Sequence, residues 1–508
     1  MAIQQTTLDA LSTHHLHADL KGRSVRGGLV TLGSQGVQFV MQSVATIVLA
    51  RLLSPADFGA VAMVTAITGL ASAFADFGLS EATIQRKEIT HEQVSTLFWI
   101  NLAIGLGLTL ITAGLGPVLA IFYREPRLIR IALFLSLTFF LGGLRVQPNA
   151  LLKRQMRFSA LAFRDIAAYM TAVPIAILLA WRGAGYWTLV AMPLILNFVQ
   201  MALSWMMVKW RPGLPRRGSQ VRSMLTFGGN ISASYLIFNL NRSFDSILIG
   251  WYWGAAPLGL YSRAYNLLML PVRQLSTPAG NVTIPAFSRL QEDPERFARY
   301  YLRAIGLIIW ITAPIFGFLF VAAKPVVVLV LGAKWSEAAP VFQFLVISAL
   351  GQILIESTIW LLVSRGQSSR LLKLLLIISP ILVCSFAIGL PFGIKGVALS
   401  GSLVLLGILP WVLKFTFRGT NLTLLRLGRA IVYPIALCFF GVILANVCLH
   451  FAGAVKITSQ LLVDAMGFIL AFSISALIPG FRAEIASLKD SLGALGFSRR
   501  TTVWPVTQ

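Results

Sequence analysis

Residues 94–122 read VSTLFWINLAIGLGLTLITAGLGPVLAIF, a run of twenty-nine residues without an acidic or basic side chain. A helix needs about 20 predominantly apolar residues to cross the hydrocarbon core of a bilayer. Lipid offers the backbone no hydrogen-bond partner, which makes a helix the default spanning element. The run therefore predicts a membrane-spanning helix.

Similar runs, separated by short polar breaks, fill most of the chain. Hydrophobic residues make up 57% of the 508 residues, only 12% are charged, and the mean hydropathy is +0.79. Soluble domains carry about 25% charged residues. The sequence thus predicts an all-α integral membrane protein with about fourteen spanning helices, at residues 29–53, 59–80, 94–122, 128–147, 162–181, 186–208, 223–249, 258–287, 304–331, 340–363, 371–392, 394–413, 430–450 and 457–479.

The basic residues predict how the chain is threaded through the membrane. The 42 Lys and Arg residues exceed the 18 Asp and Glu residues and give a net charge of +24. If the N-terminus is cytosolic, thirty of the 42, Arg145 and Arg164 among them, fall on the cytosolic side and nine on the other. This bias predicts that both termini are cytosolic. The cations are spread among loops along the whole chain, which argues against a nucleic-acid partner.

A weak internal repeat predicts two lobes. The turn PADFG at 55–59 recurs as AAPLG at 255–259, and each copy leads into a predicted helix. Six helices separate the two openings, so the lobes share one orientation in the membrane. The predicted parts are a cytosolic tail (1–28), an N-terminal lobe of six helices (29–210), a basic cytosolic linker (211–222), a C-terminal lobe of six helices (223–417), an additional helix pair (430–479) and a second cytosolic tail (480–508).

No catalytic, cofactor or metal site is predicted. The sequence lacks a Walker lysine motif, His-Glu-x-x-His, Gly-x-Ser-x-Gly and a pair of close aspartates. Its three cysteines lie in apolar runs, and no thiol accompanies the histidines near the N-terminus. The predicted external breaks are about ten residues or shorter, so a transporter is favoured over a polysaccharide polymerase or ligase.

One predicted helix, 258–287, is unusually polar along one face. Its candidate substrate-binding residues are Arg263, Asn266, Arg273, Thr277 and Asn281. Charged groups at membrane depth cost about 2.5–3.5 kcal/mol on insertion scales and tend to face a cavity. We expect this face to line a passage, and three prolines and Gly280 to interrupt the helix. The alternative is that Arg263 snorkels to the rim and that Arg273 pairs with a carboxylate.

Other polar residues within the predicted helices are weaker candidates. Arg242 and Asp245 are spaced for either an intrahelical ion pair or substrate contact. Gln38 and Gln42 could bind sugar hydroxyls or join neighbouring helices. Four acids could couple transport to a proton or sodium gradient: Asp76, Asp165, Asp245 and Glu356. Hydration at a cytosolic helix end explains Asp76 and Asp165 more simply.

Several segments together resemble a known family. They are ARLLSPADFG (50–59), ADFGLS (75–80), IQRK (84–87), PNALLKRQMRF (148–158), LGLYSRAY (258–265) and PAFSRLQ (285–291). They resemble Wzx-type polysaccharide flippases, in particular the branch that exports colanic acid, teichuronic acid and succinoglycan-like polymers. The likeness covers about residues 25–420.

The resemblance implies a fold, a substrate and partners. The expected fold has two six-helix lobes in a V around a central cavity, as in the superfamily of multidrug MATE exporters and the lipid II flippase. The expected substrate is an undecaprenyl-pyrophosphate-linked oligosaccharide, turned across the bacterial inner membrane by alternating access for exopolysaccharide or lipopolysaccharide synthesis. A polysaccharide polymerase and a chain-length regulator are the implied protein partners. A pyrophosphate needs paired cations in low dielectric, which favours Arg242, Arg263 and Arg273 as its receivers.

Three alternative functions stay open at this point. A MATE-like antiporter of small cations is expected to use acidic rather than basic cavity residues. A lipid II flippase agrees with fourteen spans but less well with the quoted motifs. A scaffold for polysaccharide assembly would bind the lipid without moving it.

Overall fold

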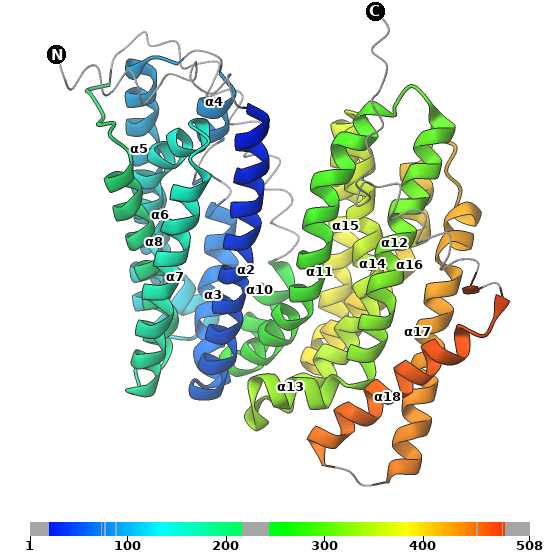
Figure 1. Cartoon of the computed structure of the whole chain (residues 1–508). Helices are drawn as coiled ribbons and strands as arrows, with labels where there is room; N and C mark the ends of the chain where they lie inside the picture. Colours follow the sequence, from blue (N-terminus) through cyan, green and yellow to red (C-terminus); the bar gives the residue numbers. More distant parts are fainter. Residues whose placement is uncertain are drawn as a thin grey trace, which may run out of the picture. The chain divides into compact units, whose positions relative to one another are not determined.

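The computed structural model describes residues 20–72, 74–75, 78–86, 89–215, 243–453, 456–479 and 481–482. Within these ranges the secondary structure is helical, without a β-strand. The chain divides into two compact units, unit 1 at Met1–Arg263 and unit 2 at Ala264–Gln508 (Figure 1).

Unit 1 is a bundle of long helices. They are α2 (Leu20–Leu52), α3 (Pro55–Ser72), α4 (Leu79–Gln85), α5 (His91–Tyr123), α6 (Arg127–Arg154), α7 (Phe158–Trp181), α8 (Tyr186–Met207), α10 (Phe244–Trp253) and the first residues of α11 (Ala255–Arg289). Helix α5 begins at a capping box, in which the Thr90 hydroxyl accepts from the Gln93 backbone N–H and the Gln93 side chain accepts from the Thr90 N–H.

Unit 2 holds the rest of α11 and the C-terminal helices. These are α12 (Pro294–Val321), α13 (Ala323–Leu331), the short η2 (Ala333–Trp335), α14 (Ala338–Ser364), α15 (Ser368–Gly389), η3 (Leu390–Phe392), α16 (Gly393–Phe417), α17 (Leu424–Ala452) and α18 (Ile457–Ser475). The C-terminal helix pair is part of this unit, since α17 packs against α12 and α18 against α17.

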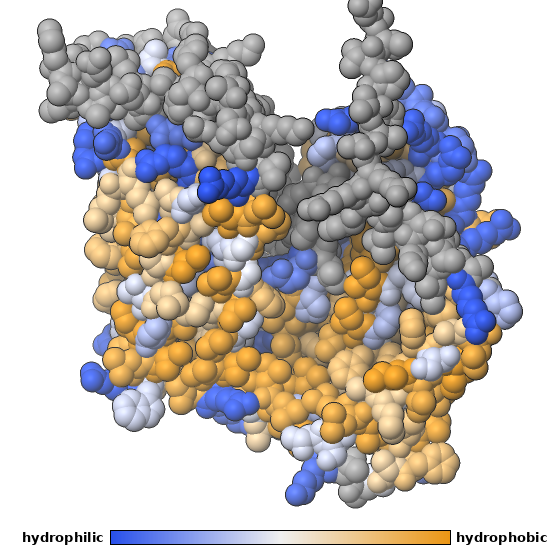
Figure 2. All heavy atoms as spheres, in the orientation of Figure 1, coloured by the Kyte–Doolittle hydropathy of each residue, from blue (hydrophilic) through white to orange (hydrophobic). Residues whose placement is uncertain are grey.

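Eleven helical stretches of the described chain are long and apolar enough to cross a membrane, one of them being 368–417, which contains both α15 and α16. Figure 2 shows a broad band of hydrophobic side chains on the visible face of each unit. Large apolar residues such as Trp181 in unit 1 and Phe451 in unit 2 are at least three-quarters exposed, 75% and 84% respectively. Such faces are suited to lipid rather than water. The protein is therefore an all-helical, multi-pass membrane protein.

Glycines bring α5 and α6 together in unit 1. A side chain at Gly105 would approach the Phe139 carbonyl oxygen to 2.7 Å, and one at Gly143 would approach the Asn101 carbonyl oxygen to 2.7 Å. Helices in lipid associate through close packing, which small residues at the crossing permit. The same packing holds α6 and its neighbours in a fixed register.

Four predicted elements differ from the structure. The span 59–80 is too long, because α3 ends at Ser72. The span 128–147 is too short, because α6 continues to Arg154. The single span 304–331 is two helices, since Pro325 has no N–H and its ring clashes with the carbonyl of residue 321, where α12 ends. The prolines of 258–287 do not interrupt α11, which is continuous from Ala255 to Arg289. Each proline removes only one backbone hydrogen bond, and the remaining hydrogen bonds keep the helix continuous.

Candidate functional site

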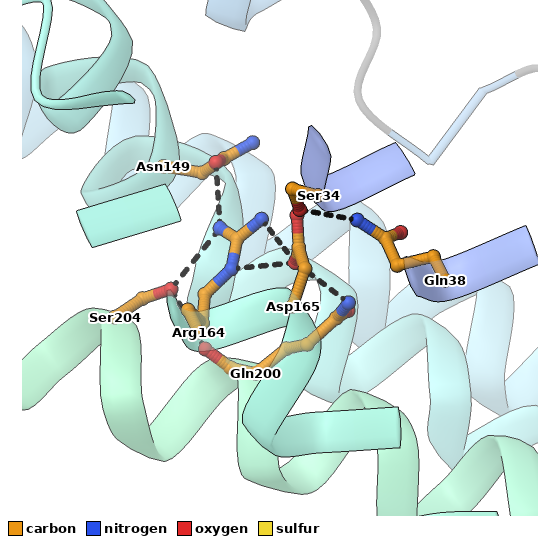
Figure 3. A network of polar contacts seen from close by, with 7 residues as sticks. All are labelled: Ser34, Gln38, Asn149, Arg164, Asp165, Gln200 and Ser204. Atoms are coloured by element: carbon orange, nitrogen blue, oxygen red, sulfur yellow. Dashed lines mark hydrogen bonds and ion pairs between the residues drawn. The ribbon is translucent and has the colours of Figure 1, made fainter. Parts of the chain in front are cut away.

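Four helices of unit 1 contribute to a network of polar side chains (Figure 3). The residues are Ser34 and Gln38 on α2, Asn149 on α6, Arg164 and Asp165 on α7, and Gln200 and Ser204 on α8. Helix α7 lies at the centre, since it packs against both α2 and α8. The network therefore joins segments far apart in the sequence.

Arg164 donates to three of its neighbours. Its Nε and Nη2 lie 2.9 and 2.6 Å from Oδ1 of Asp165. Its Nη1 donates to Oδ1 of Asn149 at 2.7 Å and to the Ser204 hydroxyl at 3.4 Å. The Arg164 side chain is only 8% exposed. A buried guanidinium with a carboxylate and two neutral acceptors is well compensated.

Asp165 is fixed from a second side by α8. The amide of Gln200 donates to Oδ1 of Asp165 at 3.0 Å, and the Ser204 hydroxyl donates to the Gln200 carbonyl at 2.7 Å. On α2, the Gln38 amide donates to the Ser34 hydroxyl at 2.9 Å. Of these contacts, the hydrogen bond from Gln200 holds the carboxylate beside Arg164.

A second arginine, Arg145 on α6, increases the positive charge of this site. It is half-buried and within electrostatic range of both Arg164 and Asp165. Among the described residues, none forms a hydrogen bond or ion pair with Arg145. Asp165 is paired with Arg164, so the positive charge of Arg145 is left without a paired carboxylate among the described residues, which is suited to an anion.

Both arginines lie well inside their helices. Arg145 is nine residues before the end of α6 at Arg154, and Arg164 is six residues after the start of α7 at Phe158. At 1.5 Å per residue these separations are about 14 and 9 Å along the helix axes. Both arginines are therefore helical residues rather than loop residues. The signal in the sequence was their position inside the predicted spans 128–147 and 162–181.

Arg263, the first predicted arginine, lies at the end of unit 1 where α3 and α11 begin. Its guanidinium carbon is 4.4 Å from the centre of the Phe58 ring. Its Nε is buried without a hydrogen-bond partner in the described chain. The charged group therefore lies over an aromatic ring of α3.

The other residues of the polar α11 face belong to unit 2. Arg273 and Asn266 are exposed. Thr277 and Asn281 are on the same helix, but their side chains lie outside the described part of the structure. No described carboxylate pairs with Arg273.

Two of the predicted residues, Arg242 and Asp76, lie outside the described residues. Asp245, the possible partner of Arg242, is buried. It accepts a hydrogen bond from the Tyr261 hydroxyl at 2.8 Å and from the Ser246 N–H at 2.6 Å. Asp245, which the sequence predicted as a site residue, is therefore already hydrogen-bonded to Tyr261 of α11.

The remaining predicted residues are separated from one another. Gln38 borders the Arg164 network, whereas Gln42 is exposed one helical turn further along α2. Glu356 is half-buried on α14 in unit 2. In the described part of the chain, no three His, Cys, Asp or Glu side chains are grouped to hold a metal ion.

The sequence interpretation missed one buried acid. Asp464 on α18 is 0% exposed, and both of its carboxylate oxygens lack a hydrogen-bond partner in the described chain. It lies within an otherwise apolar helix, where a single carboxylate is the only local signal.

Known proteins resemble this chain in sequence and in fold. The lipopolysaccharide biosynthesis protein WzxC of Escherichia coli (strain K12) is 28% identical over 310 residues, 60% of this chain and 62% of WzxC. The succinoglycan biosynthesis transport protein ExoT of Rhizobium meliloti (strain 1021) is 27% identical over 319 residues, 62% of this chain and 63% of ExoT. The chain thus matches just over three fifths of the length of each relative.

A solved structure shares the fold. The lipid II flippase MurJ, in its inward closed conformation, superposes with a TM-score of 0.68 at 12% identity, over 88% of this chain and 99% of that chain. A helical membrane fold like that of MurJ, as the resemblance implied, is thereby confirmed.

The family match covers most of unit 1 and the first part of unit 2. The family described as polysaccharide biosynthesis protein matches residues 48–340, more than half of the chain. The resemblance to Wzx-type flippases is confirmed by this match and by the two relatives. The chain belongs to the polysaccharide biosynthesis protein family.

Proposed function

We propose that this protein turns an undecaprenyl-pyrophosphate-linked oligosaccharide from the cytosolic to the external leaflet of the bacterial inner membrane. The product would supply exopolysaccharide or lipopolysaccharide synthesis. The observation that carries the proposal is the excess positive charge at Arg145 and Arg164, inside membrane-spanning helices of unit 1. An anion crossing a low-dielectric region needs such charges, because its unpaired desolvation cost is prohibitive.

The chemistry of the site is suited to a phosphate linked to a sugar. Guanidinium groups present planar pairs of donors that match phosphate oxygens. Asn149, Gln200 and Ser204 surround Arg164 with amide and hydroxyl groups. Such groups both donate to and accept from sugar hydroxyls.

Arg263 offers a second position for the anion towards the other end of unit 1. The start of α6 lies beside the start of α3, where Arg127 is 4.0 Å from Asp57. Arg145 lies towards the C-terminal end of α6. Arg263 lies near the N-terminal end of α11, eight residues or about 12 Å from its first residue. An anionic head group could therefore pass between two cationic positions, with Arg242 and Arg273 as further contributors.

The mechanism we propose is alternating access of two six-helix lobes around a central cavity, in a chain of fourteen spanning helices with both termini cytosolic. The lobes of the proposal are residues 29–210 and 223–417, joined by the basic linker 211–222. Asp76, Asp245 and Glu356 are the candidates for coupling to a proton or sodium gradient. A polysaccharide polymerase and a chain-length regulator would act on the product.

A reconstitution assay tests the proposal. The full chain is placed in liposomes with a fluorescent undecaprenyl-pyrophosphate oligosaccharide, and dithionite quenching reports the fraction in the outer leaflet. We expect the protein to accelerate exchange between leaflets and the Arg145→Gln variant to abolish that acceleration. Binding of the lipid without exchange would contradict the proposal and favour a scaffold. Transport of small cationic drugs by the same liposomes would favour a MATE-like antiporter.

A further inference from the structure

The two copies of the repeated turn touch each other within unit 1. A Cβ atom at Gly59 would lie 1.6 Å from the Ala255 carbonyl oxygen, and one at Gly259 would lie 1.8 Å from the Pro55 carbonyl oxygen. Each glycine faces the residue that opens the other copy. The contact is thus reciprocal, and it exists only because neither glycine has a side chain.

This crossing sets the distance between Phe58 and Arg263. Phe58 directly precedes Gly59 on α3, and Arg263 follows Gly259 by one helical turn on α11. Residues four apart on a helix share a face, so the face of α11 that touches α3 also carries Arg263. The guanidinium carbon of Arg263 consequently lies 4.4 Å from the centre of the Phe58 ring, which is only 4% exposed.

The neighbouring carboxylates are engaged elsewhere. Asp57 accepts from the Ser54 N–H at 3.1 Å and hydroxyl at 2.6 Å, and it faces Arg127 at 4.0 Å. Asp245 accepts from the Tyr261 hydroxyl. Among the described residues, Arg263 forms no ion pair or hydrogen bond, and its buried Nε is unpartnered. The face of the Phe58 ring is therefore the main contact described for the Arg263 guanidinium group.

We infer that Phe58 is a positioning residue for Arg263. The inference rests on the proposed function, in which Arg263 receives the phosphate of the lipid carrier. The ring attracts the cation through its negative face, and the guanidinium carbon lies 4.4 Å from the ring centre. A guanidinium group held at this position can donate its N–H groups to phosphate oxygens.

Binding measurements on the full chain in nanodiscs test this role, with undecaprenyl pyrophosphate as the probe. Phe58→Leu removes the ring, and we expect the dissociation constant to rise about 3- to 30-fold. Phe58→Tyr retains the ring and should bind like the parent. Arg263→Lys retains the charge without the planar group and should weaken binding to a similar extent, without truncating the core. Phe163→Leu is the matched control, because Phe163 is 60% exposed on α7.

A double variant separates positioning from general damage. If Phe58 acts through Arg263, the Phe58→Leu/Arg263→Ala protein binds no more weakly than Arg263→Ala alone. Additive losses, or failure of Phe58→Tyr to retain binding, would overturn the inference.

A second measurement does not depend on the ligand. Phenylglyoxal modifies accessible arginines, and mass spectrometry reports the rate at Arg263 in the lipid-free protein. We expect Phe58→Leu to raise this rate several-fold, and an unchanged rate would refute positioning by the ring. If the parent protein fails to bind undecaprenyl pyrophosphate while the modification rate changes, the proposed ligand is wrong but the contact stands.

Discussion

Nη2 of Arg164 lies 2.6 Å from Oδ1 of Asp165, its immediate neighbour in the sequence. Consecutive residues of a helix do not face each other, so the long arginine side chain must bend back towards the carboxylate. Gln200 donates to the same oxygen from α8. The pair therefore joins α7 to α8 as well as balancing charge.

Replacing Asp165 tests how far this pair stabilises unit 1. Asp165→Asn keeps the shape of the side chain but removes its negative charge, which leaves Arg164 and Arg145 without a carboxylate. Removing one partner of a buried ion pair costs about 3–5 kcal/mol, and we expect the lower part of that range because the Asp165 side chain is 20% exposed. Thermal unfolding in detergent measures the loss. A variant as stable as the parent would mean that water or lipid compensates the arginines.

Arg145→Gln should separate function from stability. Arg145 has no described bonding partner, so its removal should leave the unfolding temperature unchanged or slightly higher. Polymer export should fall to background if this excess charge receives the anion. Arg130→Gln is the control, because Arg130 is exposed on the same helix. Equal export from both variants would remove Arg145 from the transport path.

The helices were largely predictable because each needs only a long apolar run. Predicted spans such as 186–208 and 340–363 agree closely with α8 (Tyr186–Met207) and α14 (Ala338–Ser364). Hydropathy identifies these helices without knowledge of their neighbours. Helix α11 is the exception. Because of its polar face, it is not among the eleven stretches that are apolar enough to cross a membrane. Its prolines do not break the helix.

The contact of Asn149 with Arg164 was not predictable because Asn149 lies beyond the predicted end of the span at residue 147. Hydropathy along α6 falls at Arg145, yet the helix continues through Leu151 and Leu152, which are fully buried against Leu97 and other core residues. Tertiary packing therefore extends the helix beyond its apolar run. Those later residues place Asn149 within the helix, whereas Arg145 already lay inside the predicted span.

Arg273→Ala tests the polar face of α11 in unit 2. Arg273 is exposed, and no described carboxylate depends on it for neutralisation. We expect the variant to be inserted and folded but unable to export polymer. Export assays and membrane fractionation check both parts, with Arg299→Ala on α12 as an exposed control. Normal polymer output would exclude Arg273 from the mechanism.

Gly59→Ala should disrupt the contact between the two repeated turns. The added methyl group would lie 1.6 Å from the backbone oxygen of Ala255, which cannot move like a flexible side chain. We expect a loss of about 3 kcal/mol of stability, at the upper end of overpacking effects. Gly69→Ala on the same helix meets nothing within 4 Å and should be neutral or stabilising by up to about 1 kcal/mol. Similar unfolding temperatures for the two variants would contradict the close backbone approach.

Asp464→Leu should stabilise unit 2. The Asp464 carboxylate is fully buried, and none of the described groups donates to either oxygen. Burial of a polar group without a compensating hydrogen bond costs about 1–3 kcal/mol in proteins, and leucine removes that cost while filling the space. We expect a higher unfolding temperature, with Met466→Leu, an exposed position on the same helix, as the control. A lower unfolding temperature would mean that the carboxylate is compensated in the membrane, and a loss of export at raised stability would assign the residue to transport.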